Sequence, residues 1–256
     1  MRISDAFKRG KAFIGFITCG DPDLETTEKL IETMEKGGVD LIELGIPFSD
    51  PAGEGPVIQG ANLRGLDAGI TTDKIFQMVG RVRKTVKIPM VFMTYGNVVF
   101  SYGIERFIKT CAEIGIQGLI LPDVPFEEKE EFSNMCDKYD VDFISLIVPT
   151  SGNRISRIAK KGGGFIYCVS PMGAAGIRSS IGADVDSMVA LVRAETKVPV
   201  ALDFGVSTPE QAGYMAKKAD GIIVSSAIVK IIEQHGKEAI PKVYEYVKSV
   251  RDALDL

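Results

Sequence analysis

The sequence predicts an α/β protein that folds as a single (β/α)8 barrel domain over residues 1–256. The chain has 256 residues, a length typical of such barrels. Eight apolar, β-type runs alternate with amphipathic helical patterns from end to end, and no linker or low-complexity segment divides them. Seven of these runs are almost continuously apolar, as expected of parallel strands buried on both faces. An open doubly wound sheet is the alternative, but such sheets usually have fewer strands.

The individual elements follow from the apolar runs and from the residues that mark helix ends. The eight expected strands cover residues 12–18, 39–45, 89–95, 118–122, 142–148, 164–169, 198–204 and 221–225. Acidic or threonine starts and glycine or cationic ends mark helical patterns at 23–38, 71–86, 104–115, 126–139, 183–196, 208–219 and 237–254. A short helix is also expected at the N-terminus. The Gly-, Ala- and Ser-rich stretch 167–180 after the sixth strand has the composition of a long mobile lid loop.

Composition excludes several classes of partner. The chain is 45% hydrophobic and 25% charged with a formal net charge of −4, so nothing indicates nucleic acid or an anionic membrane as a partner. No apolar run approaches the length of a membrane span. The first residues lack the plan of a secretory signal peptide, so a cytoplasmic location is expected.

The few cysteines and the single histidine argue against metal and triad chemistry. Four cysteines, at 19, 111, 136 and 168, show no paired spacing and are expected as reduced buried thiols. His235 is the only histidine, which speaks against a histidine-based metal site or a Ser-His-Asp triad. It precedes a glycine and is expected at a helix C-terminus.

The stretch 41–59, LIELGIPFSDPAGEGPVIQ, carries the strongest signal of chemistry. Glu43 lies near the end of an apolar strand, where an unpaired charge is costly, and Glu54 lies in the glycine-rich loop that follows. Two carboxylates in this arrangement suit acid/base work. The alternatives are a core carboxylate paired with an arginine or lysine for Glu43, and a solvated loop charge for Glu54. Because side chains alternate along a strand, Glu43 faces the barrel mouth if Ile42 and Leu44 pack on helices.

Other polar residues follow strand ends, which form the working face of such barrels. Gly20 and Pro22 make a tight turn after the first strand, where Asp21 or Asp23 is expected to cap the next helix. Asp123 stands in a loop stiffened by prolines after the fourth strand, with helix capping as its alternative role.

Two strand-to-helix turns near the end of the chain have the character of a phosphate site. The stretches FGVSTPEQ (204–211) and SSAIVK (225–230) follow the last two strands directly. Backbone N–H groups in such turns, with a helix N-terminus, form the usual phosphate cradle of a barrel.

Residues 43–64 also carry a resemblance. ELGIPFSDP (43–51), followed by GPVIQ (55–59) and ANLR (61–64), closely resembles the tryptophan synthase alpha subunit family of indole-3-glycerol-phosphate lyases, which fold as TIM barrels. The resemblance implies a retro-aldol cleavage of indole-3-glycerol phosphate to indole and glyceraldehyde 3-phosphate, as a step of tryptophan biosynthesis. It implies no metal or organic cofactor in this chain. It also implies an α2β2 assembly with a pyridoxal-phosphate-dependent beta subunit that takes the indole onward.

The same resemblance assigns roles to individual residues. Glu43 would be the acid/base at indole C3 and the side-chain hydroxyl, and Glu54 would accept or polarise the indole N–H. An apolar slot for the ring, with Asp123 in its wall, would comprise Phe16, Ile58, Tyr95, Ile120, Tyr167 and Phe204. The phosphate would be held by Gly176, Gly205, Ser225 and Ser226.

The chain departs from the family pattern at four site positions, which keeps other functions open. Relatives commonly have aspartate at Glu54, threonine at Ala175, and glycine at Asp203 and Ser225. The bulk and negative charge of Asp203 should disfavour an anion nearby. One alternative is therefore a catalytically weak barrel that binds and activates the beta subunit. Another is a barrel that acts on a different sugar phosphate.

Overall fold

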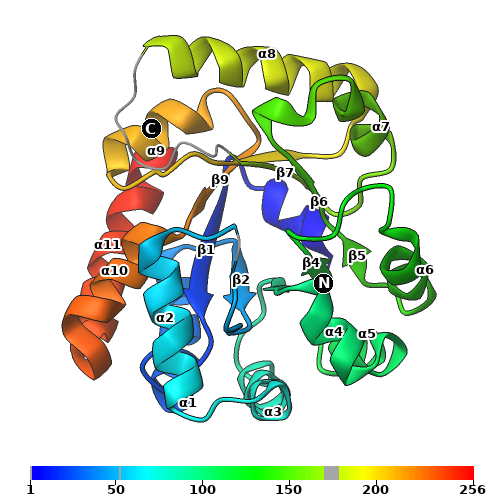
Figure 1. Cartoon of the computed structure of the whole chain (residues 1–256). Helices are drawn as coiled ribbons and strands as arrows, with labels where there is room; N and C mark the ends of the chain where they lie inside the picture. Colours follow the sequence, from blue (N-terminus) through cyan, green and yellow to red (C-terminus); the bar gives the residue numbers. More distant parts are fainter. Residues whose placement is uncertain (1, 52, 170–178) are drawn as a thin grey trace.

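The computed structural model describes residues 2–51, 53–169 and 179–256. Figure 1 shows a ring of strands surrounded by helices, with the C-terminal helix packed beside the helices that follow the first and last strands. Most of the predicted lid, including Ala175 and Gly176, lies outside the described residues.

The strands form the expected parallel barrel. Within the described residues they are β1 (Ala12–Thr18), β2 (Leu41–Gly45), β3 (Met90–Met93), β4 (Gly118–Ile120), β5 (Asp142–Phe143), β6 (Ser145–Ile147), β7 (Ile166–Val169), β8 (Val200–Asp203) and β9 (Gly221–Val224). Their order in the sheet is β5-β4-β3-β2-β1-β9-β8-β7-β6, and every pair is parallel. All eight predicted strands are present.

The fifth predicted strand closes the barrel by changing partner along its length. Its first part, β5, pairs with β4, and its second part, β6, pairs with β7. Ile144 separates the two and donates its backbone N–H to the Leu119 carbonyl at 2.9 Å. Because the two ends of the strand order are neighbours in the chain, the (β/α)8 prediction is confirmed and the open doubly wound sheet is not.

Within the described residues, the helices include all seven predicted patterns and four more, one of which, α10 (Ser226–His235), follows the strand-to-helix turn expected at 225–230. They are α1 (Leu24–Gly37), α2 (Pro56–Asp67), α3 (Thr72–Val82), α4 (Gly96–Tyr102), α5 (Ile104–Glu113), α6 (Glu130–Lys138), α7 (Ile155–Lys160), α8 (Ser179–Glu195), α9 (Pro209–Ala216), α10 (Ser226–His235) and α11 (Ala239–Leu254). Short 3₁₀ helices lie at Ile3–Phe7, Pro149–Arg154 and Gly236–Glu238. In the described parts of the chain, no helix combines the length and apolar character needed to cross a membrane.

Helix α2 is the largest difference from the sequence-based prediction. That prediction assigned residues 54–59 to a loop and placed no helix there. Helix α2 begins at Pro56, and proline is favoured at the first helical position because its missing N–H has no partner there in any case. Other helix ends follow the expected rules: Asp23 accepts the Thr26 N–H at the start of α1, and His235 ends α10 before Gly236.

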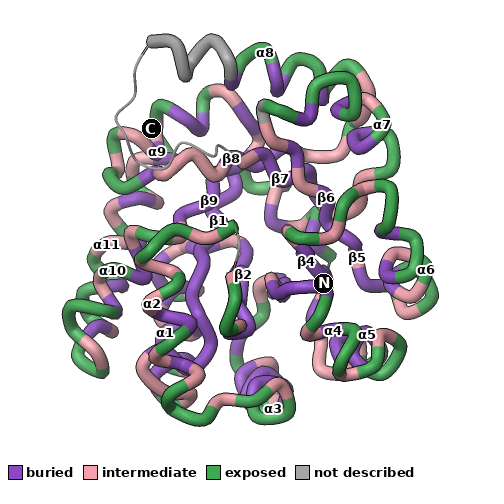
Figure 2. Tube along the Cα trace, in the orientation of Figure 1, coloured by how far each residue is buried: buried purple, intermediate pink, exposed green. Residues whose placement is uncertain are grey.

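Alternation along the strands separates two apolar layers. Side chains that face inward fill the barrel, among them Ile14, Leu41, Ile120, Ile144, Ala201 and Ile223. Their neighbours in sequence face outward and pack under the helices, as Ile42 and Leu44 do on β2. Figure 2 shows the strands almost wholly buried inside a partly exposed helical shell. Glu43 shares the inward parity of Leu41, so it stands above the barrel core at the end of β2.

The N-terminal 3₁₀ helix closes the end of the barrel at which the strands begin. Ile3 is fully buried and belongs to the inner apolar layer. A Cβ atom added to Gly118 would lie 2.8 Å from Ile3 Cδ1 and 2.9 Å from Ile144 Cδ1.

We therefore expect Gly118→Ala to destabilise the protein by about 1–2 kcal/mol, because overpacking forces core side chains out of their preferred rotamers. Urea unfolding measures the change. The matched control is Gly80→Ala in α3, where an added Cβ meets nothing within 4 Å. That change should stabilise by about 0.5–1 kcal/mol, the usual gain of alanine over glycine inside a helix. Equal effects of both substitutions would contradict the packing argument.

Candidate active site

A cavity of about 460 Å³ opens at the C-terminal ends of the barrel strands. Its walls are formed by the inward-facing side chains nearest the C-terminal ends of the strands, by α2 and the loop before it, and by the turns after β8 and β9. The lining residues are Phe16, Glu43, Gly53, Glu54, Gly55, Pro56, Val57, Ile58, Met93, Tyr95, Pro122, Leu146, Tyr167, Val169, Asp203, Gly205, Val206, Ser207, Ser225, Ser226 and Ala227. The cavity thus joins an apolar slot to a polar end.

Glu43 is fully buried, and neither of its carboxylate oxygens has a hydrogen-bond partner among the described residues. Burial raises the pKa of Glu43 well above its ordinary value, and the negative charges of Asp203 and Glu54 raise it further. The shift therefore favours the protonated form of Glu43. A buried carboxyl that keeps its proton near neutral pH is suited to act as a general acid.

Asp203 faces the cavity from the last residue of β8. Its Oδ2 atom accepts a hydrogen bond from the Tyr167 hydroxyl at 2.9 Å and one from Ser225 Oγ at 3.4 Å. Burial raises the pKa of Asp203, while the Tyr167 hydrogen bond opposes this shift. Because Tyr167 donates its proton to Asp203, the neighbouring Glu43 is left without that donor.

Glu54 is held at the start of α2 by the helix itself. Its side chain accepts a hydrogen bond from Asn62 Nδ2, and its backbone carbonyl accepts one from Gln59 Nε2 at 2.7 Å. Burial raises the pKa of Glu54, with the Asn62 hydrogen bond acting in the opposite direction. The half-buried carboxylate therefore has one fixed donor and can still accept a second hydrogen bond, from a molecule in the cavity.

An ion pair between the first turn and α2 fixes this helix over the site. Arg64 on α2 donates two hydrogen bonds to Asp21, Nε to Oδ1 and an Nη to Oδ2, both at 2.8 Å. Asp21 is 1% exposed. Of the two aspartates expected to cap α1, Asp23 does so, and Asp21 instead anchors α2.

The polar end of the cavity contains the start of α10. Gly205, Ser225 and Ser226 all line it. Ser225 is the N-cap of α10, but its side chain makes no capping hydrogen bond, so the first backbone N–H groups of this ten-residue helix remain available. Thr208, by contrast, caps α9 by accepting the Gln211 N–H. The N-terminus of α10, which lies beside Gly205 and Ser226, can therefore bind an anion at this end of the cavity.

Comparison with known proteins decides the family. A family model described as tryptophan synthase alpha chain matches residues 4–255. The tryptophan synthase alpha chain of Lacticaseibacillus casei is 46% identical over 254 residues, which cover 99% of this chain and 96% of that protein. This chain belongs to the tryptophan synthase alpha chain family.

Other members of the tryptophan synthase alpha chain family agree in sequence and in fold. The protein from Caldanaerobacter subterraneus is 44% identical, with 99% of this chain and 98% of that one covered. The crystal structure of the alpha subunit from Legionella pneumophila superposes with a TM-score of 0.90 at 34% identity, covering 99% of this chain and 98% of that one. A chain of Mycobacterium tuberculosis tryptophan synthase has a TM-score of 0.91 at 30% identity, covering 100% and 98%.

Most of the residues that the family resemblance singled out meet at this cavity. Those that line it are Phe16, Glu43, Glu54, Ile58, Tyr95, Tyr167, Gly205, Ser225 and Ser226. Tyr95 is 3% exposed, stacks on Phe48 at 4.9 Å between ring centroids, and accepts the Gly53 N–H at 3.4 Å. Burial raises the pKa of Tyr95 to about 12, so its hydroxyl keeps its proton.

Three of the expected residues lie elsewhere, and a fourth is not among the described residues. Ile120 belongs to the inner barrel layer and does not line the cavity of the described structure. Phe204 faces outward and packs against the layer under the helices, because its neighbour Asp203 takes the inward position. Asp123 is exposed and accepts the Gly96 N–H at 2.9 and 3.1 Å, so it caps α4. Gly176 lies outside the described residues.

The structure adds wall residues that sequence reasoning missed. Met93 and Leu146 extend the apolar slot from β3 and β6, and Asn62 fixes Glu54. Strand parity could have identified Met93, because it lies two residues before Tyr95. Within the described residues, no three histidine, cysteine or acidic side chains form a cluster able to hold a metal ion.

Proposed function

We propose that this chain cleaves indole-3-glycerol phosphate to indole and glyceraldehyde 3-phosphate by a retro-aldol reaction in tryptophan biosynthesis. The proposal rests chiefly on one observation: a buried, unpartnered Glu43 and a half-buried Glu54 face the same largely apolar cavity, which ends at an uncapped helix N-terminus. The indole ring fits the apolar slot, and the phosphate fits the polar end. Membership of the tryptophan synthase alpha chain family supports the same substrate.

Glu43 can carry both proton transfers of the cleavage. The protonated carboxyl gives its proton to indole C3, and the carboxylate then removes the proton of the side-chain hydroxyl next to the breaking bond. As the hydroxyl becomes the aldehyde, the C–C bond electrons return to the ring and Glu43 is protonated again. This order requires a carboxyl that starts protonated, which its raised pKa provides.

Glu54 stabilises the positive charge that appears on the ring. Protonation of C3 leaves the indole nitrogen as a cationic N–H, and the Glu54 carboxylate accepts a hydrogen bond from it. Asn62 keeps that carboxylate in place. A charge-assisted hydrogen bond of this kind is stronger in the transition state than with neutral substrate, so it lowers the barrier.

Binding of the phosphate group positions the other end of the substrate, where the bond breaks. The N–H groups at the start of α10, with Gly205 and Ser226, bind it, and remote binding energy is used to align C3 with Glu43. Asp203 lies close to Ser225, but its carboxylate already accepts hydrogen bonds from Tyr167 and Ser225. It is therefore oriented toward these hydroxyls within the protein.

A beta subunit that carries pyridoxal phosphate completes the proposal as the partner that consumes indole, in an α2β2 complex within the cytoplasm. The chain itself uses no bound cofactor in this scheme. The alternative of a catalytically weak barrel that only activates its partner is not favoured, because both carboxylates face one cavity beside a free helix N-terminus. The alternative sugar phosphate lacks any comparable support.

The test is indole release from indole-3-glycerol phosphate by the purified chain, with and without a beta subunit. The chain contains no tryptophan, so indole fluorescence is measured without protein background in the absence of the partner. We expect release that rises when the partner is added. No indole under either condition, with tight partner binding, would support the non-catalytic alternative instead.

The charge on Asp203 should influence the pH above which kcat/KM falls. Asp203→Asn removes a negative charge that raises the pKa of Glu43, so the pKa of Glu43 falls. Glu43 must start protonated, and therefore the alkaline limb of the kcat/KM profile should move to lower pH. Asp186→Asn, which changes an exposed carboxylate paired with Lys218, serves as the control and should leave the limb in place. An unchanged or upward-shifted limb in Asp203→Asn would disprove this role.

A further inference from the structure

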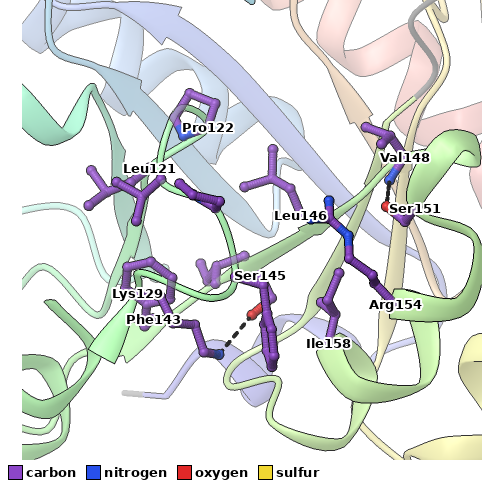
Figure 3. Close-up of a pocket in the computed structure, with 14 residues that line it drawn as sticks. Leu121, Pro122, Lys129, Phe143, Ser145, Leu146, Val148, Ser151, Arg154 and Ile158 are labelled. Atoms are coloured by element: carbon purple, nitrogen blue, oxygen red, sulfur yellow. Dashed lines mark hydrogen bonds between the residues drawn. The ribbon is translucent and has the colours of Figure 1, made fainter. Parts of the chain in front are cut away.

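A second cavity, of about 160 Å³, lies beside the active-site cavity. Figure 3 shows it between the ends of β4 and β6 and the segments that lead into α6 and α7. The lining residues are Leu121, Pro122, Val124, Pro125, Phe126, Lys129, Phe143, Ile144, Ser145, Leu146, Val148, Ser151, Arg154 and Ile158. Pro122 and Leu146 also line the active-site cavity, so the two share a wall.

Lys129 gives this cavity a buried positive charge. The residue is only 6% exposed. Its Nζ atom lies 3.3 Å from the Lys161 carbonyl oxygen and 3.4 Å from Ser145 Oγ, both at or beyond the long end of hydrogen-bond distances (Figure 3 shows the latter). Among the described residues, no carboxylate lies within 4 Å of it.

Aromatic rings surround the ammonium but do not neutralise it. Nζ lies 4.7 Å from the ring centroid of Phe126 and 5.6 Å from that of Phe143. Burial lowers the pKa of Lys129, the charge of Lys161 lowers it further, and the more distant charge of Asp137 opposes this shift without forming an ion pair. A buried charge without an opposite charge is costly, so an anion that enters the cavity would gain a strong partner.

The rest of the cavity determines which anion fits. Arg154 adds a second cation, half exposed and 3.3 Å from Glu127, so its charge is already paired on the surface. Leucine, isoleucine, valine, proline and phenylalanine side chains supply most of the remaining wall. One unpaired buried cation in an apolar wall matches a monoanion with a small apolar body. A phosphate dianion would leave excess negative charge desolvated.

We propose that this cavity is a binding site for a small organic carboxylate, whose anionic group pairs with Lys129 and whose apolar body packs against Leu121, Val148 and Ile158. This site is separate from the proposed lyase reaction and does not depend on it. Lys129 lies outside the residues that hold the indole and the phosphate in that proposal.

The test uses three probes at constant ionic strength: benzoate, benzyl alcohol, which keeps the body without the charge, and inorganic phosphate, which keeps the charge without the body. Methyl NMR signals of Leu121, Val148 and Ile158 report this cavity, and that of Ile58 reports the active-site cavity. We expect saturable shifts of the three reporters with benzoate. Benzyl alcohol and phosphate should bind there at least tenfold more weakly.

Lys129→Met removes the charge and keeps a side chain of similar length in the apolar wall. Benzoate affinity at the three reporters should fall at least tenfold in this variant, and Lys129→Gln provides a second variant if methionine disturbs folding. Lys138→Met, which removes an exposed lysine from the end of α6, the helix that Lys129 precedes, should leave the affinity unchanged. Equal benzoate affinity in Lys129→Met and the wild type, shifts confined to Ile58, or equally tight benzyl alcohol or phosphate would overturn the proposal.

Discussion

Glu43→Gln should lower kcat for indole release by about 10³-fold, the middle of the range that a positioned acid/base contributes. Glutamine has the same size and shape as protonated glutamate, but its amide neither gives a proton to C3 nor removes one from the hydroxyl. Substrate contacts in the apolar slot and at α10 are untouched, so KM should change little. Steady-state kinetics by indole fluorescence measure both constants.

Two comparisons make the Glu43 result specific. Glu113→Gln, on the exposed face of α5, should leave kcat at the wild-type value. Urea unfolding should show a folded variant, because the glutamine amide has the size and shape of the protonated carboxyl that it replaces. A rise in KM with kcat unchanged would mean that Glu43 binds substrate without transferring protons, and the proposed mechanism would be wrong.

Asp21→Ala should destabilise the protein by about 2–3 kcal/mol, somewhat less than the 3–5 kcal/mol typical of breaking a fully buried ion pair. The change removes both 2.8 Å hydrogen bonds to Arg64. The loss is reduced because the Arg64 side chain is 32% exposed and also contacts Glu233 at 3.2 Å. Since this pair holds α2 over the cavity, KM for the substrate should rise as well.

A double-mutant cycle with Arg64→Met separates the pair from other effects of losing Asp21. If the two residues act together, the double variant should be destabilised by less than the sum of the single variants. Glu25→Ala breaks an exposed pair with Lys29 and should not shift the unfolding midpoint. Strict additivity of the two single changes would contradict a direct role for the Asp21–Arg64 contact in holding α2.

The order of strands and helices was predictable from the chain because each element carries a local signal. Apolar runs of strand length mark all eight strands, and capping residues such as Asp23 and Thr71 mark helix starts. The parity rule applied to β2 placed Glu43 at the barrel mouth on the condition that Ile42 and Leu44 pack on helices, and they do pack there. Local signals were weaker for α2, where glycines and prolines before Pro56 favoured a loop.

Strand parity also explains the positions of site residues that differ from expectation. Asp203 and Phe204 are adjacent, so only one of them can face the cavity, and the inward position of Ala201 assigns it to Asp203. The family resemblance implied that Phe204 lines the apolar slot and that Asp203 lies near the phosphate. It did not say which of these two adjacent side chains faces the cavity. The position of Asp123 could not be predicted from the sequence either. Its side chain caps α4 by accepting the N–H of Gly96, which is 27 positions earlier in the chain, and the two residues meet only in the folded protein.

By itself, the sequence determined the barrel, the order of its elements and the presence of two carboxylates at one strand end and the following loop. Only the tertiary structure decided their chemistry. The raised pKa of Glu43 depends first on its burial and then on the charge of Asp203, which is distant in the chain. Lys129 belongs to a charged run, FEEKEEF, that looks solvent-exposed in the sequence but is buried in the structure. Burial and pairing are properties of distances between segments, and those distances exist only once the barrel has closed.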